Sequence, residues 1–273
     1  MVCKILPMKY ILICSNPEIA KHSQEIGVNT ILVDLEKYGK RERQGPGTWI
    51  TDHNLETVSK IRKSISGELL VRVDPWKEET KEQIDESIER GANSIMLPMI
   101  KNLQEIEEFI DYVGKRANIL PMIETKDAFS IMNAILELEQ IKEIFIGLND
   151  LHLSLSLSFM FEPLSKGLID KVSELTLKKG KKFGFGGIAL IGEGELKSDL
   201  ILSEHIRLQS SSVILSRSFH KNAKDLKDLY SKIDFEHEFN KLKTKEMEIK
   251  SLSSKDLERN RSILRKEVIR ILN

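Results

Sequence analysis

A (β/α)₈ barrel followed by a C-terminal helical arm is the fold class that the sequence predicts, and three observations lead to it. Eight short apolar runs rich in β-branched residues recur along residues 10–216, and segments with helical periodicity or capping residues separate them. The runs are apolar on both faces, which is typical of a parallel sheet covered by helices. Eight such units in about 220 residues match the usual size of a barrel. A doubly wound open sheet is the alternative, but the first run lacks the glycine-rich phosphate turn of that fold.

The elements are predicted in chain order from these runs. The expected strands are Tyr10–Cys14, Thr30–Leu35, Glu68–Val73, Ser94–Pro98, Asn118–Ile123, Glu143–Gly147, Lys182–Gly187 and Ser211–Ser216. Residues that suit a helix N-cap precede three of the intervening helices, namely Asn54, Asn102 and Thr125. Glycines that suit a left-handed C-terminal cap follow three helices, namely Gly91, Gly114 and Gly180. We expect the barrel to span residues 1–233.

Residues 234–273 are predicted to form the helical arm. One helical stripe consists of Phe235, Phe239, Leu242 and Ile249, and a second consists of Leu257, Leu264, Val268 and Ile271. Ser253 and Asp256 between them have the spacing of a capping box. Two amphipathic helices beyond a closed barrel must bury their stripes against the barrel wall or against another subunit. In the second case the arm is an oligomerisation arm.

The composition excludes several classes of protein. The 273 residues carry 42 lysines and arginines against 42 aspartates and glutamates, and a net charge of zero argues against a nucleic-acid partner. No apolar run approaches the roughly 20 residues of a membrane span, and the N-terminus lacks the features of a signal peptide. Cys3 and Cys14 are too few for a disulfide framework. We therefore expect a soluble, cytoplasmic protein.

Function in a barrel is carried by residues at the C-terminal ends of the strands. Polar residues in that position are Asp34, Glu36, Arg72, Asp74, Glu124, Asn149, Asp150, Gly186, Gly187 and Arg217. Glu124 and Asp150 follow consecutive strands, so their carboxylates are expected to converge. Two converging carboxylates repel unless a cation lies between them, and an all-oxygen ligand set favours Mg²⁺ or Mn²⁺. The alternative is that each is only a helix N-terminal acid stabilised by the helix dipole.

Arg72 alternates with Val71 and Val73 and is therefore expected to face the barrel interior, where a guanidinium needs an anion. That anion is a substrate carboxylate or, alternatively, a structural partner among Asp34, Glu36 and Asp74. The polar loop 34–47 is expected to be a lid or a subunit contact, with Lys40–Arg43 as a solvated face. His53 near its end is a candidate proton carrier or, alternatively, a surface residue.

Several of these segments resemble one family. The segments are Val33–Glu36, Val71–Asp74, Ile123–Thr125 and Phe145–Leu151. In this order they resemble the HpcH/HpaI aldolase and citrate lyase β-subunit family, over roughly residues 10–220. The resemblance implies a (β/α)₈ barrel that uses Mg²⁺ or Mn²⁺ to stabilise an enolate during carbon–carbon bond cleavage or formation. It also implies a trimer or hexamer assembled through the C-terminal helices.

The resemblance assigns roles to individual positions. Glu124 and Asp150 would be the metal ligands, Arg72 would bind the keto-acid or thioester oxygen, and Asp34 and Glu36 would order the metal-bound water and the neighbouring loop. Two departures stand out. Lys37 stands where pyruvate aldolases of the family carry His and the citrate-lyase branch carries Asp. Met122 stands where those aldolases carry Gln. The substrate therefore does not transfer from either branch.

Three hypotheses follow. The first is a metal-dependent lyase or aldolase of a pyruvate-like 2-oxo acid, with Arg72, Asn149 and Glu36 contacting the substrate. A metal-bound hydroxide, Asp34 or His53 would move the proton. The second is an acyl-CoA lyase. Its candidate phosphate-binding residues are Arg41, Arg43 and Arg217. The third, suggested by Lys37 and Met122, is a barrel without catalytic activity.

Overall fold

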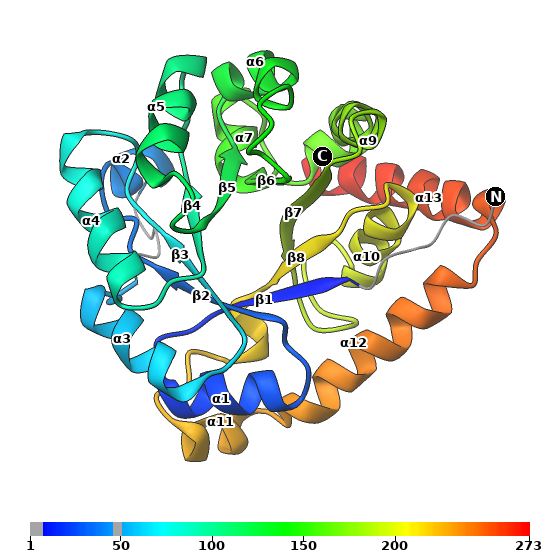
Figure 1. Ribbon diagram of the computed structural model, residues 1–273. Coiled ribbons are helices and arrows are strands. Elements are labelled where there is room, and N and C mark those ends of the chain that lie inside the picture. The colour runs from blue at the N-terminus through cyan, green and yellow to red at the C-terminus, as the bar shows by residue number, and fades with distance from the viewer. Residues whose placement is uncertain (1–7, 46–50) are drawn as a thin grey trace.

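The computed structural model describes residues 8–45 and 51–273; Cys3 and the end of the loop at residues 46 and 47 lie outside this range. Eight parallel strands close into a barrel in which each strand pairs with the next and β8 pairs with β1 (Figure 1). The strands are β1 Lys9–Ile13, β2 Thr30–Asp34, β3 Glu68–Arg72, β4 Ser94–Leu97, β5 Asn118–Ile123, β6 Glu143–Ile146, β7 Lys182–Ile188 and β8 Ser212–Leu215. All eight predicted strands are confirmed, with ends that differ by at most one residue.

The strands are buried on both faces, as their apolar runs predict. The inner face forms a small core inside the barrel, made of Ile11, Leu32, Leu70, Met96, Leu120, Met122 and Phe145. The outer face packs on the surrounding helices in a second, larger core that contains Val71 and Val73. Because side chains alternate along a strand, the residue two positions beyond an inner-core residue also faces the barrel axis.

The helices surround the barrel (Figure 1). The helices up to β7 are α1 Pro17–Glu25, α2 Lys40–Gln44, α3 Leu55–Ser64, α4 Glu78–Glu89, α5 Leu103–Val113, α6 Lys126–Ile135, α7 Leu148–Ser154, α8 Glu162–Ser165 and α9 Leu168–Lys178. Those that follow are α10 Ser198–Arg207, the 3₁₀ turn η1 Arg217–Phe219, α11 Leu226–Lys232, α12 Phe235–Lys250 and α13 Ser254–Leu272.

The predicted capping residues lie where the sequence placed them. Asn54, Asn102 and Thr125 each accept a backbone hydrogen bond in the first turn of the helix that follows. Gly91, Gly114 and Gly180 have φ values of 96°, 57° and 64° at helix ends. Glycine adopts these positive values without the strain that a Cβ brings, so it suits these helix ends.

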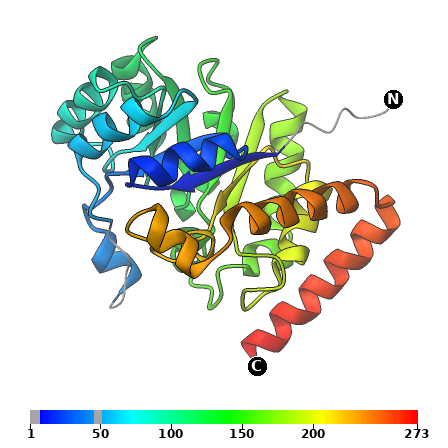
Figure 2. The same cartoon turned by 90° about the horizontal axis from the view of Figure 1, so that it is seen from below.

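The C-terminal arm packs on the barrel wall of its own chain. Phe239 of α12 is fully buried and meets the ring of Tyr10 edge-on at a centroid distance of 5.2 Å. The Tyr10 hydroxyl donates to Glu246 Oε2 at 2.6 Å. Helix α13 turns back from the end of α12 (Figure 2) and buries Leu264 and Val268, next to α10 and α8. The stripes are therefore covered within the chain, and the oligomerisation role of the arm stays a prediction. No described helix has the length and apolar character to cross a membrane.

Candidate active site

A cavity of about 500 Å³ opens at the C-terminal ends of the strands, where the sequence predicts the site. Nine of the predicted residues line it, namely Asp34, His53, Arg72, Glu124, Asn149, Asp150, Gly186, Gly187 and Arg217. Alternation along the strands explains the convergence of three of them, because Asp34, Arg72 and Glu124 each lie two positions after an inner-core residue. Glu36 is buried next to them and makes ion pairs with the basic residues of the site.

Asp34 and Arg72 form the centre of the site. The register of β2 and β3 places them opposite each other, and Arg72 donates from Nε to Asp34 Oδ1 at 2.8 Å and from Nη2 to Oδ2 at 2.7 Å. Burial alone would raise the pKa of Asp34, but Arg72 and Lys40 outweigh it and hold that pKa far below its usual value. Asp34 is therefore a structural partner of Arg72, which the sequence could not choose among Asp34, Glu36 and Asp74. Its Nη1 lies 3.7 Å from Met122 Sδ.

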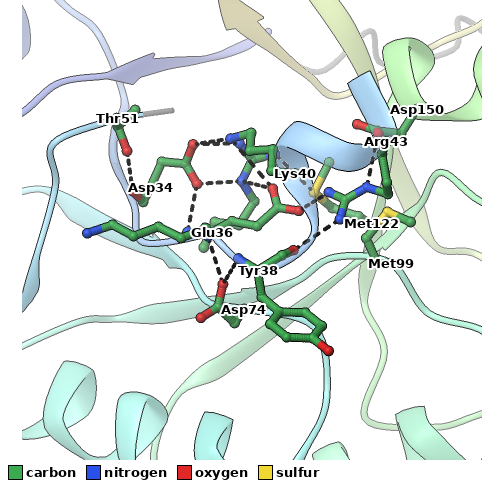
Figure 3. Close-up of polar contacts among 12 residues, drawn as sticks. Asp34, Glu36, Tyr38, Lys40, Arg43, Thr51, Asp74, Met99, Met122 and Asp150 are labelled. Atoms are coloured by element: carbon green, nitrogen blue, oxygen red, sulfur yellow. Dashed lines mark hydrogen bonds and ion pairs between the residues drawn. The ribbon is translucent and has the colours of Figure 1, made fainter. Parts of the chain in front are cut away.

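The loop after β2 differs from its prediction. Lys40–Arg43 was expected to be a solvated face, but Lys40 is only 5% exposed. Its Nζ lies 2.9 Å from Asp34 Oδ2 and 3.6 Å from Glu36 Oε2. Arg43 makes ion pairs with Glu36 and Asp150 (Figure 3). The prediction was wrong for these two residues because the local pattern does not show that α2 lies beside a cluster of buried carboxylates.

Glu124 follows the last residue of β5 and is held in place on both sides. Its Oε1 accepts a hydrogen bond from the Met99 backbone N–H at 3.0 Å. Its Oε2 lies over Gly147, where an added Cβ would come within 2.3 Å of it. Burial, followed by the charges of Glu36 and Asp150, raises the pKa of Glu124 to about 8. The positive charges around Glu124 therefore do not balance the burial and the neighbouring carboxylates that disfavour its ionised form.

Asp150 lies in the first turn of α7, so the helix dipole stabilises its negative charge. This agrees with the alternative explanation of Asp150 as a helix N-terminal acid. Asp150 also lies near enough to Glu124 to raise the pKa of that residue. Two carboxylates at one side of a cavity are a donor set that suits a hard divalent cation completed by water and substrate oxygens. Glu124 and Asp150 are therefore the residues that could hold a metal. Within residues 8–45 and 51–273, no three histidine, cysteine, aspartate or glutamate side chains lie together so that they could hold one metal ion.

The two histidines of the cavity wall are oriented by backbone groups. His53 Nδ1 accepts the Asp34 N–H at 3.0 Å, and His220 Nδ1 accepts the Asn222 N–H at 3.1 Å. Burial lowers the pKa of both, and that of His220, also affected by Arg217 and His53, falls to about 4. A neutral imidazole that accepts at Nδ1 carries its proton on Nε2. His53 is therefore a hydrogen-bond donor rather than a ready base.

Sequence reasoning missed His220 and Lys40 as residues of the cavity wall. His220 lies five residues after the end of β8, and its place in the segment that follows a barrel strand could have identified it. Lys40 had no such signal, because its burial depends on the path of α2. Arg217 lines the cavity near β8, whereas Arg41 is exposed on α2.

The closed parallel barrel with an acidic pair and a buried arginine at its strand ends is the arrangement of a barrel enzyme. A family model described as HpcH/HpaI aldolase/citrate lyase matches residues 10–161. The chain belongs to this family. No protein of curated function matches the sequence.

Solved structures agree on the fold. A family protein from Burkholderia cenocepacia has a TM-score of 0.61 at 12% identity, covering 79% of this chain and 90% of its own. An HpcH/HpaI aldolase from Desulfitobacterium hafniense has a TM-score of 0.59 at 15% identity, covering 91% and 95%. A citrate lyase β subunit from M. tuberculosis, solved with oxaloacetate and magnesium, has a TM-score of 0.55 at 13% identity, covering 77% and 92%.

Proposed function

We propose that this protein is a carbon–carbon lyase or aldolase that acts on a pyruvate-like 2-oxo acid through an enolate and depends on Mg²⁺ or Mn²⁺. One observation carries the proposal: a buried Glu124 next to Asp150, with a pKa raised to about 8, shares a cavity with Arg72. Magnesium and oxaloacetate are bound by the citrate lyase β subunit of similar fold, which supports the same ligand classes here.

Glu124 and Asp150 would hold the cation, which when bound would stabilise negative charge on the ketone oxygen of the substrate. Arg72 supplies a permanent positive charge for the substrate carboxylate or ketone oxygen, because burial does not neutralise a guanidinium paired with Asp34. Asp34 orients Arg72 and, with its low pKa, is a poor proton acceptor. His53 offers its Nε2–H to a substrate oxygen. The expected substrate contact of Asn149 stays a prediction.

The proposal is tested with the metal and the substrate separately. Manganese binding is followed by electron paramagnetic resonance, and exchange of the pyruvate methyl protons with D₂O is followed by NMR. We expect both in the wild type and neither in Glu124→Gln. Glu42→Gln, an exposed change of the same kind on α2, is the control and should behave as the wild type. A wild type that neither binds Mn²⁺ nor exchanges protons refutes the proposal and supports the non-catalytic barrel.

An acyl-CoA thioester is the second candidate substrate. Arg217 and Lys224 line the cavity on the side of β8 and α11, where they could contact CoA phosphates. Arg43 is engaged by Glu36 and Asp150, which disfavours it as a CoA contact. Protection from thermal unfolding by CoA thioesters, but not by pyruvate, would favour this candidate.

A homo-oligomer, trimer or hexamer, remains part of the proposal. The apolar side chains of Ile263, Ile269 and Leu272 on α13 are 40%, 59% and 42% exposed, which is consistent with a contact to a second copy. Light scattering coupled to size-exclusion chromatography tests this, and a monomer at micromolar concentration would refute it.

A further inference from the structure

Arg43 of α2 contacts three residues around the candidate metal site. Its Nη2 is paired with Glu36 Oε1, its Nη1 donates to the Tyr38 carbonyl at 3.1 Å, and its Nε lies 3.4 Å from Asp150 Oδ1 (Figure 3). The side chain is 21% exposed. The guanidinium therefore links the buried Glu36 with Asp150, one of the two residues that could ligate a metal.

The contacts of Arg43 differ in strength. The pair with Glu36 is short and involves a carboxylate that is 2% exposed, so the charge on that carboxylate makes Arg43 difficult to remove from it. The contact with Asp150 at 3.4 Å exceeds the length of a good charge-assisted hydrogen bond. It is therefore the contact that can be released while the arginine remains anchored on Glu36.

A divalent cation and this guanidinium compete for the carboxylate of Asp150. Both are attracted by the same carboxylate, and each repels the other at short range. Lys40 does not share this conflict, because its Nζ is directed to Asp34 and Glu36. Of these two basic residues, Arg43 is therefore the one that meets the cation at Asp150.

We propose that Arg43 is a positioning residue that competes with the divalent cation for Asp150, so that metal binding displaces Nε from Asp150 while Nη2 stays on Glu36. The inference rests on the proposed function, since it takes Glu124 and Asp150 as the metal ligands. By thermodynamic reciprocity, Arg43 weakens metal binding by the same factor by which the metal weakens the Arg43–Asp150 contact.

The test is a Mn²⁺ titration of the full chain, followed by electron paramagnetic resonance, without substrate. Arg43→Gln should bind Mn²⁺ about ten-fold more tightly than the wild type. Arg43→Lys keeps the charge and should restore affinity toward that of the wild type. Arg41→Gln removes the same charge from an exposed position on the same helix and should stay within about two-fold, because surface charges are screened.

A second measurement separates competition from a purely structural role. The rise in melting temperature on adding saturating Mn²⁺ should be larger for Arg43→Gln than for the wild type, because tighter binding to the folded state adds stability. Equal or weaker Mn²⁺ binding by Arg43→Gln overturns the inference and leaves the proposed function intact. If no variant binds Mn²⁺, the metal site itself is refuted and the inference falls with it. Binding that survives Glu124→Gln unchanged would also refute both.

Discussion

Replacing Gly147 with alanine probes the contact on which the candidate metal site depends. Gly147 is the N-cap of α7 with φ −81° and ψ 86°, which is not the left-handed conformation that requires glycine. An added Cβ would lie 2.3 Å from Glu124 Oε2, 2.8 Å from Glu124 Cβ and 3.0 Å from Met122 Cε. The substitution therefore acts through the Glu124 side chain.

The magnitude follows from how firmly Glu124 is held. Its Oε1 is bonded to the Met99 N–H, so the carboxylate cannot turn away without losing that bond. Overpacking of this kind costs roughly 1–3 kcal/mol. For a chain of this size, each kcal/mol lowers the melting temperature by about 2–4 °C, so we expect a decrease of roughly 2–12 °C. The displaced carboxylate should also lose Mn²⁺ affinity.

Thermal unfolding in EDTA and Mn²⁺ titration of Gly147→Ala measure the two effects. Gly187→Ala is the matched control, because Gly187 also lines the cavity and its Cβ would meet only Ile214 O at an ordinary 3.7 Å. If Gly147→Ala melts and binds Mn²⁺ like the wild type, Glu124 does not lie over Gly147 as described, and the geometry of the site is wrong.

Three further predictions concern the same framework. Because the pKa of Glu124 is raised from 4.5 to about 8, the folded protein binds this proton more tightly than the unfolded chain, and stability falls as the pH rises through that interval. In EDTA, Glu124→Gln should therefore be more stable than the wild type at pH 8.5, by up to roughly 3–5 kcal/mol. At pH 4 the two proteins should differ little in stability. Urea unfolding measures both differences, and equal differences at the two pH values contradict the prediction. Asp34→Asn removes the carboxylate that accepts both short hydrogen bonds of the buried Arg72 and leaves it only the longer contact with Glu36, which should cost about 3–5 kcal/mol. Asp52→Asn is the control, and an unchanged urea midpoint for Asp34→Asn would show that the pair is not buried. Phe239→Ala should cost roughly 3–5 kcal/mol if α12 packs on its own barrel, and an unchanged melting temperature with altered oligomeric state would instead place the helix between subunits.

The strand pattern allowed much of the site to be predicted. In a parallel barrel the C-terminal strand ends all meet on one rim, and alternation decides which of their residues face inward. Asp34, Arg72 and Glu124 could be identified in this way because each follows an inner-facing apolar residue by two positions. Their partners could not be identified, since Asp34, Glu36 and Asp74 were equally plausible acids for Arg72 until the register of β2 and β3 was known.

The sequence by itself determined the barrel, its eight strands, the helix caps and the inward-facing polar residues, because each depends on the periodicity or local chemistry of neighbouring residues. Only the tertiary structure decided that Lys40 and Arg43 turn toward the carboxylates, that His53 accepts a backbone hydrogen bond and that the arm covers its own barrel. These features depend on the path of loops and helices across the strand ends and the barrel wall. Burial and charge there are set by segments distant in the chain, which no local pattern contains.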